Sequence, residues 1–288
     1  MISFTDADVN GVRLHCASAG AGEPVLLLHG FPDFWYLWRT LLPRLGRSRL
    51  AVAPDMRGYN RSSKPPRIED YRLATLAGDI AALIDRLGGR AAVVGHDWGG
   101  VVAWELAARH PERVGRLAIV NAPHPAIFRR ELTHNPAQRA ASGYIERLCA
   151  HGAAAALAAD DYAILAQLVI GPGLERGYFS EADAAAYRDA WAQPGALEGM
   201  LNYYRANNFA PDRAPDRASA PAEMATSQPI AVPTLVIWGE DDPVLLPGCL
   251  NGLDAVAADL RIVRVPRASH AIVHERPELL AELLEDFL

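Results

Sequence analysis

Hydrophobic residues in this chain form short runs that alternate with helical patterns over most of its length. Six runs are rich in β-branched residues and end in glycine, proline or a polar residue, at 24–30, 49–55, 91–97, 115–122, 233–239 and 260–266. Runs of this length and composition predict buried strands. Between two of them, "TLAGDIAALIDRLGG" (75–89) repeats apolar residues at helical spacing and stops at two glycines, a usual helix exit. Strands alternating with helices predict a parallel sheet covered on both faces.

Two regions depart from this alternation. The opening stretch "VNGVRLHCASAG" (9–20) contains Asn-Gly, a hairpin signal, and predicts an antiparallel edge of the sheet. Between about residues 125 and 230, alanine-rich helical patterns follow one another without strands, and a Pro/Ala/Ser-rich segment (210–229) predicts a linker. We therefore predict a core built from 1–125 and 226–288, with a helical cap and linker over 126–225.

Composition narrows the classes of partner. The chain has 288 residues, half of them hydrophobic, and a formal charge of −6 without a basic block. Nucleic acid and anionic membranes are therefore not expected as partners, and a small neutral or weakly polar ligand fits better. Cys16, Cys149 and Cys249 have no paired spacing, which argues against a disulfide framework or a zinc site.

The amino-terminal sequence and the lengths of the apolar runs bear on location. The first residues carry acids where a signal peptide needs basic residues and then an apolar core, and no apolar run approaches membrane-spanning length. We expect a cytoplasmic protein. The sequence contains no metal cluster or phosphate-binding loop pattern, so no cofactor is expected.

Polar candidates for chemistry follow the predicted strands. They are His29, Asp55, Asp97, Asp242 and His270. The carboxyl ends of parallel strands meet at one edge of a sheet, and the crevice there is the default ligand site.

The Gly-x-Asp-x-Gly pattern at 95–99 matches a strand-turn-helix nucleophile elbow, with aspartate where many hydrolases carry serine. The order Asp97, Asp242, His270 is that of a nucleophile, an acid and a base in hydrolase triads. Competing interpretations are an ordinary N-cap for Asp97, the neighbours Glu240 and Asp241 for Asp242, and His274 for His270.

Several motifs in this order resemble the epoxide hydrolase branch of the α/β-hydrolase superfamily, over nearly the whole chain. They are "HGFPDFWYLWR" (29–39), "DMRGYNRSSKP" (55–65), "GHDWGG" (95–100), "NAPHP" (121–125), "NYYRANN" (202–208) and "WGEDDPV" (238–244). The resemblance implies a mostly parallel eight-stranded sheet flanked by helices, with a helical cap. It also implies that an epoxide is opened to a vicinal diol through an ester on Asp97, without a cofactor.

The resemblance also assigns roles to individual residues. His270, oriented by Asp242, would activate water to cut the ester, and the backbone amides of Phe31 and Trp98 would stabilise the oxyanion. Two cap tyrosines, Tyr204 and Tyr144, would donate hydrogen bonds to the epoxide oxygen.

Substrate contacts are expected from five residues: Phe31, Pro32, Trp35, Trp98 and Tyr203. Tyr203 also competes with Tyr204 for the catalytic position, because neighbouring helical residues point about 100° apart. The chain departs from the family pattern at Gly143, where a tryptophan is usual, at Leu148-Cys149, where Phe-Gln is usual, and at Asn60, where glycine is frequent.

Other functions remain open at this point. A haloalkane or haloacetate dehalogenase would use the same aspartate nucleophile, but such enzymes usually carry Asn or Glu where this chain has Phe31, or an arginine where it has Trp98. A hydrolase-fold binding protein would generally lack a triad member. The expected partners are an epoxide and water, in a monomer or a homodimer.

Overall fold

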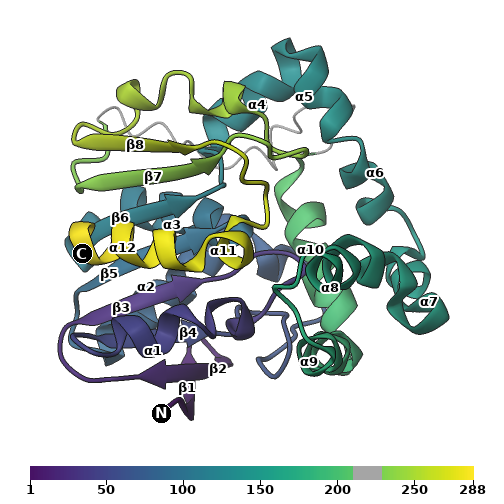
Figure 1. Ribbon diagram of the computed structural model, residues 1–288, viewed down its shortest axis with the longest axis horizontal. Helices are drawn as coiled ribbons and strands as arrows, with labels where there is room; N and C mark the ends of the chain where they lie inside the picture. The colour runs from purple at the N-terminus through teal and green to yellow at the C-terminus, as the bar shows by residue number, and fades with distance from the viewer. Residues whose placement is uncertain (210–228) are drawn as a thin grey trace.

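One eight-stranded sheet forms the centre of the protein (Figure 1). The computed structural model describes residues 1–209 and 229–288. The strands lie in the order β1-β2-β4-β3-β5-β6-β7-β8. They are β1 (Ser3–Val9), β2 (Val12–Ala19), β3 (Pro24–Leu28), β4 (Leu50–Pro54), β5 (Ala91–His96), β6 (Val114–Val120), β7 (Thr234–Gly239) and β8 (Leu260–Val265). The pairs from β4 to β8 are parallel, and β2 is antiparallel to both β1 and β4, so the expected fold class is confirmed.

The edge hairpin follows from its turn residues. Asn10 and Gly11 both have positive φ values, 45° and 74°. A two-residue turn with this geometry matches the right-handed twist of the strands that it joins, and asparagine and glycine tolerate it best. The predicted antiparallel edge is therefore present.

Alternating side chains of the strands pack on two different sets of helices. In β3, Leu26 and Leu28 join the cluster that contains α2 (Leu73–Arg86) and α3 (Trp98–Arg109). Val25 and Leu27 join the cluster on the other face. That second cluster contains α1 (Leu41–Leu45) and α12 (Pro277–Phe287), and α12 lies in front of the sheet in Figure 1. Both faces are buried, as the continuous apolar runs predict.

A helical insertion separates β6 from β7. It comprises α4 (Pro125–His134), α5 (Pro136–Ala141), α6 (Tyr144–Cys149), α7 (Ala153–Leu165), the π-helical turn η4 (Ala166–Ile170), α8 (Gly171–Glu175), α9 (Glu181–Ala192) and α10 (Ala196–Asn207). Helices α6 to α10 lie together on one side of the sheet in Figure 1. The linker predicted over 210–229 lies outside the described residues, apart from Pro229.

The remaining helical turns are short. They are η1 (Trp35–Trp38), η2 (Ile68–Tyr71), η3 (Pro111–Arg113), η5 (Pro247–Leu250), η6 (Leu253–Ala255) and α11 (Ile272–Glu275).

The run from Ala153 to Glu175 corrects one expectation. By length and composition alone it could cross a membrane, and 28% of its most apolar window is buried. The backbone turns left-handed at Asp160, Asp161 and Tyr162, which interrupts the helix with two carboxylates, so we assign the run to the helical insertion.

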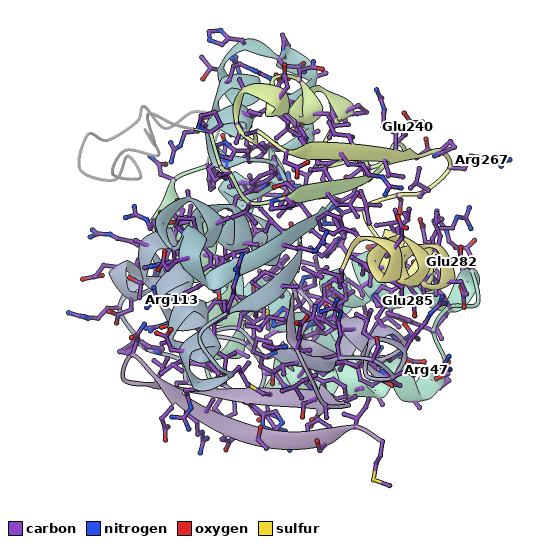
Figure 2. The ribbon with its side chains drawn as sticks, turned by 90° about the vertical axis from the view of Figure 1, so that its left-hand side faces the viewer. Arg47, Arg113, Glu240, Arg267, Glu282 and Glu285 are labelled. Carbon is purple, nitrogen blue, oxygen red and sulfur yellow. The ribbon has the colours of Figure 1, made fainter. Side chains whose placement is uncertain are left out.

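Charges of both signs are interspersed on the surface, and Figure 2 shows Glu240, Arg267 and Glu282 at its outer edge. Arg113 pairs with Asp85 at 2.9 Å, and Glu240 pairs with Arg264 at 2.7 Å. Cys16 and Cys249 are buried thiols.

Candidate active site

Asp97 stands at the turn between β5 and α3 in an unusual backbone conformation. Its φ and ψ are 51° and −126°, a region that side-chain-bearing residues rarely occupy. A methyl group at Gly99 would collide with the backbone of Leu28, and one at Gly30 would collide with the Asp97 carboxylate. The glycines therefore allow strand, loop and helix to approach while the carboxylate projects between them.

Backbone amides lie beside this carboxylate. The Phe31 amide donates a hydrogen bond to Asp97 Oδ1 at 2.8 Å. Trp98 is the first residue of α3, so its amide is among those that have no partner within the helix. The two amides expected to form an oxyanion hole thus flank Asp97.

Two residues distant in the sequence complete a line of charged groups. His270 Nε2 lies 3.6 Å from Asp97 Oδ2, and His270 Nδ1 lies 2.7 Å from Asp242 Oδ2. The competing residues lie elsewhere: Asp241 is exposed, Glu240 pairs with an arginine, and His274 contacts Tyr187. The structure therefore brings together the three residues that the sequence selects.

Asn121 is a residue of this site that sequence reasoning missed. Its Nδ2 donates to Asp242 Oδ2 at 2.8 Å, and its Oδ1 accepts from the Gly239 amide at 2.7 Å. The amides of Val244 and Leu245 donate to the other oxygen of Asp242, each at 2.9 Å. Asn121 directly follows the strand β6, as Asp97 directly follows β5. This position at the carboxyl end of a strand could have marked Asn121 as a candidate site residue.

These contacts keep Asp242 ionised. Burial alone would raise the pKa of this carboxyl, but the charge of His270 and the hydrogen bonds lower it below its ordinary value. For His270, burial opposes the charged form, yet Asp242 and Asp97 together raise the pKa well above its ordinary value. An imidazolium between two carboxylates is thus the favoured resting state.

Two other histidines serve the scaffold, as expected. Burial lowers the pKa of both His29 and His96 to about 4, so both are neutral. His96 Nε2 lies 2.9 Å from the carbonyl oxygen of His270, and His29 Nε2 accepts from the Met56 amide at 2.9 Å. The first of these contacts fixes the loop that carries His270.

Tyr204 of α10 and Tyr144 of α6 face Asp97 from the helical insertion. Their ring centroids lie 6.3 Å apart, and Tyr204 packs edge-on against Trp98 at 5.1 Å and Phe31 at 5.5 Å. Burial and the charge of Asp97 raise the pKa of both phenols, so both stay protonated and can donate.

A small cavity of about 30 Å³ adjoins these groups. Its lining is mostly apolar: Asp97, Trp98, Val101, Pro123, Phe128, Tyr144, Ile145, Tyr204, Phe209 and Leu245. The volume accommodates about one or two water molecules, so a substrate must displace surrounding side chains. Sequence reasoning missed six of these residues because their apolar side chains fit a core position equally well.

Of the five residues expected to contact substrate, Trp98 lines the cavity, and Phe31, Pro32, Trp35 and Tyr203 do not. The Tyr203 hydroxyl donates to the Arg57 carbonyl at 2.8 Å, inside the core. Trp35 packs edge-on against Phe4 at 5.1 Å, and the Pro32 carbonyl accepts from the Trp191 indole at 2.8 Å. Tyr204, not its neighbour, therefore faces the cavity.

Asn60 has a local structural role. Its φ of 38° is the left-handed turn that asparagine tolerates, and its Nδ2 donates to Asp55 Oδ2 at 2.8 Å. Asp55 also accepts from the Trp35 amide at 3.0 Å. Burial raises the pKa of Asp55 to about 6. Asp55 does not line the cavity, and its hydrogen bonds hold Asn60 and the start of η1 in place.

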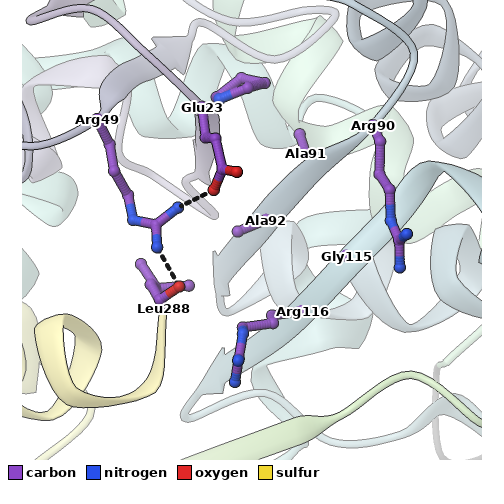
Figure 3. Close-up of a pocket in the computed structure, with 9 residues that line it drawn as sticks. Glu23, Arg49, Arg90, Ala91, Ala92, Gly115, Arg116 and Leu288 are labelled. Atoms are coloured by element: carbon purple, nitrogen blue, oxygen red, sulfur yellow. Dashed lines mark hydrogen bonds and ion pairs between the residues drawn. The ribbon is translucent and has the colours of Figure 1, made fainter.

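A larger hollow, of about 310 Å³, lies where the parallel strands begin, at the opposite end from Asp97 (Figure 3). Arg49 lines it and donates to Glu23 at 3.1 Å and to the Leu288 carbonyl oxygen. Its other two arginines, Arg90 and Arg116, are exposed at the starts of β5 and β6. The candidate chemistry therefore belongs to the smaller cavity.

Comparisons with known proteins agree with this geometry. The α/β hydrolase fold family matches residues 23–277. An α/β hydrolase superfamily protein of Bacillus subtilis, YfhM, is 37% identical over 98% of this chain and 96% of its own length. Epoxide hydrolase A of Mycobacterium tuberculosis is 34% identical over 96% of this chain and 95% of its own length.

A solved structure is similar over the same extent. The structure of an epoxide hydrolase mutant from Bacillus megaterium, complexed with its product (R)-3-[1]naphthyloxy-propane-1,2-diol, has a TM-score of 0.91 and 34% identity, covering 98% of this chain and 99% of that one. This protein belongs to the α/β-hydrolase superfamily and, within it, to the epoxide hydrolase family.

Proposed function

We propose that this protein opens an epoxide to a vicinal diol in two steps at Asp97. The observation that carries the proposal is the line Asp97–His270–Asp242, with distances of 3.6 Å and 2.7 Å, opposite two protonated tyrosines. A carboxylate can attack an sp³ carbon and form an ester, and that ester can be cut by water at its carbonyl carbon.

In the first step Asp97 Oδ2 attacks an epoxide carbon. Oδ1 is held by the Phe31 amide and becomes the carbonyl oxygen of the ester. The carbon–oxygen bond of the ring breaks, and the alkoxide takes a proton from Tyr204 or Tyr144. Both tyrosines sit on the insertion, which we propose acts as a cap over the site.

In the second step His270 removes a proton from water as the water attacks the ester carbonyl. The developing oxyanion at Oδ1 is stabilised by the Phe31 and Trp98 amides. Formation of the ester removes the charge of Asp97, one of the two charges that hold the proton on His270. His270 therefore gives up its proton, which restores the phenol of the tyrosine that protonated the alkoxide, and the neutral ring then takes the proton of the attacking water. Release of the diol returns the charge to Asp97 and leaves that proton on His270.

The effect of the Asp97 charge on His270 can be measured. In Asp97→Asn the negative charge beside His270 is lost, so the His270 pKa should fall, by on the order of 1 to 3 pH units. The measurement is an NMR titration of the His270 ring in both proteins. An unchanged His270 pKa would contradict the proposed effect of the Asp97 charge.

The tyrosines give a second prediction. Tyr204→Phe removes a donor to the epoxide oxygen and should slow ester formation about 10²-fold, as loss of an oxyanion donor does. Rapid mixing of excess enzyme with epoxide measures this step directly.

Tyr203→Phe is the matched control. It removes the neighbouring hydroxyl, whose partner is the Arg57 carbonyl, and should cost about 1 kcal/mol of stability without a specific loss of rate. Equal slowing in both variants would remove Tyr204 from the mechanism.

The cavity lining supports an uncharged, lipophilic epoxide, because apolar residues surround Asp97. The product bound by the Bacillus megaterium mutant, an aryloxy diol, is likewise uncharged and carries a large aromatic group. The test is to incubate the purified protein with aryl and alkyl epoxides, measuring diol, and with chloroalkanes and haloacetates, measuring halide. Halide release without diol would replace the epoxide proposal by dehalogenation.

A further inference from the structure

One face of α9 attaches the insertion to the loop that supplies the Phe31 amide. Asp183, Tyr187 and Trp191 are spaced four residues apart and so lie on one side of this helix. Asp183 Oδ1 pairs with Arg39 Nε at 2.8 Å, and the Trp191 indole donates to the Pro32 carbonyl at 2.8 Å. The middle residue, Tyr187, contacts two polar side chains, Asp33 and His274.

Tyr187 belongs to a buried chain of hydrogen bonds. Its hydroxyl donates to Asp33 Oδ1 at 2.6 Å and lies 3.2 Å from His274 Nε2. Arg39 Nη1 lies 3.4 Å from His274 Nδ1, and a guanidinium can only donate. His274 Nδ1 is therefore the acceptor, Nε2 carries the proton, and every bond runs in one direction: Arg39 to His274, His274 to Tyr187, Tyr187 to Asp33.

The chain is shielded from solvent and ends on a charge. Tyr187 is fully buried, and the side chains of His274 and Asp33 are 6% and 10% exposed. Burial would raise the pKa of Asp33, but the neighbouring His274 Nε2–H and the Tyr187 hydroxyl lower it. Removing the Tyr187 hydroxyl would leave a buried carboxylate without its shortest hydrogen bond.

Two members of this chain, Asp33 and His274, lie close in sequence to reacting groups. Asp33 is two residues from Phe31, and the Asp33 amide donates to the Gly30 carbonyl at 3.0 Å. His274 is one helical turn after His270, in α11. A tyrosine of the insertion thus connects the loop of the oxyanion amide with the segment of the general base.

We propose that Tyr187 is a positioning residue that holds the Phe31 amide and the His270 segment in place for hydrolysis of the ester on Asp97. This inference rests on the proposed function. In ester formation the Phe31 amide only orients Asp97, whose Oδ1 it holds. Ester hydrolysis needs the same amide to stabilise the developing oxyanion and needs His270 as the base. The two steps should therefore respond differently to loss of the Tyr187 hydroxyl.

Kinetics of Tyr187→Phe provide the first test. Hydrolysis of the ester should slow roughly tenfold, since small misplacement of reacting groups has effects of this order or larger. Because kcat/KM reports ester formation, kcat and KM should fall together while kcat/KM stays within about twofold, and the ester should accumulate in the steady state. A fall in kcat/KM at unchanged kcat would indicate only a loosened insertion and would overturn the proposal.

Matched variants separate the hydroxyl from general packing. Tyr178→Phe removes a hydroxyl from a ring stacked on His274 at 5.7 Å, outside the chain of hydrogen bonds, and should leave both steps unchanged. His274→Gln keeps an amide donor near the position of Nε2 and should retain more activity than His274→Asn, whose amide lies near Nδ1. The reverse order would contradict the chain.

Hydrogen exchange measured by mass spectrometry tests the same coupling without any substrate. Tyr187→Phe should speed exchange both in peptides covering 25–34 and in peptides covering 266–275, while Tyr178→Phe should not. Faster exchange confined to α9 would overturn the proposal. If the wild-type protein formed no diol, the proposed function would fail, but the exchange result would still decide the coupling.

Discussion

Asp97→Asn is expected to lower diol formation by at least about 10³-fold, because an amide oxygen is a far weaker nucleophile than a carboxylate. The substitution is nearly isosteric, and the Phe31 amide can still donate to Oδ1. Folding should therefore be preserved, and the loss should lie in the chemical step. The measurement is diol released per enzyme over several hours, with thermal unfolding recorded in parallel.

A control for this variant is available on the exposed surface. Asp241→Asn makes the same chemical change one residue from Asp242, at an exposed side chain, and should leave the rate within about twofold. Full diol formation by Asp97→Asn would mean that water attacks the epoxide directly, and the covalent mechanism would have to be abandoned.

The second large effect is expected from His270→Gln. Glutamine cannot accept a proton from water, so steady-state turnover should fall on the order of 10² to 10⁴-fold, the usual contribution of a general base. Ester formation needs no base and should continue for one turnover. Intact-mass spectrometry should therefore show a protein heavier by one epoxide, and peptide mapping should place the addition on Asp97.

The mass gain distinguishes His270→Gln from a simple loss of structure, since an unfolded protein would not form a specific ester. His134→Gln is the matched control, because His134 is exposed on α4, and it should turn over normally without a stable adduct. An inactive His270→Gln protein of unchanged mass would show that His270 acts before the ester forms.

Local patterns predicted most of the sheet. Each of the six apolar runs overlaps a strand. Five of these strands are buried along most of their length, so their residues are consecutively apolar, whereas β8 is an edge strand with three exposed residues. The turn at Asp97 could also be predicted from the sequence. Its glycines are required because the strand, the turn and the helix approach closely there, and these glycines lie within a few residues of Asp97. The choice of Tyr204 over Tyr203 followed from the family resemblance, and the cavity supports it.

Contacts between distant segments were harder to foresee. Asn121 and Asp242 are separated by 121 positions, and no local sequence pattern in either segment predicts their hydrogen bond. Trp35 was expected at the substrate but packs on the edge hairpin, because an aromatic residue near a site satisfies either environment. The left-handed residues that interrupt the insertion at Asp160–Tyr162 have no glycine to mark them.

The backbone conformation at Asp97 lowers the stability of the fold, but the side chain at that position is needed for activity. A residue with a side chain held at such φ and ψ values costs on the order of 1 to 3 kcal/mol, and glycine would relieve that cost while removing the nucleophile. A library screened for heat resistance alone would therefore enrich glycine at position 97. In a lineage released from selection for turnover, this position should be among the first to drift, leaving a more robust protein that has lost its chemistry.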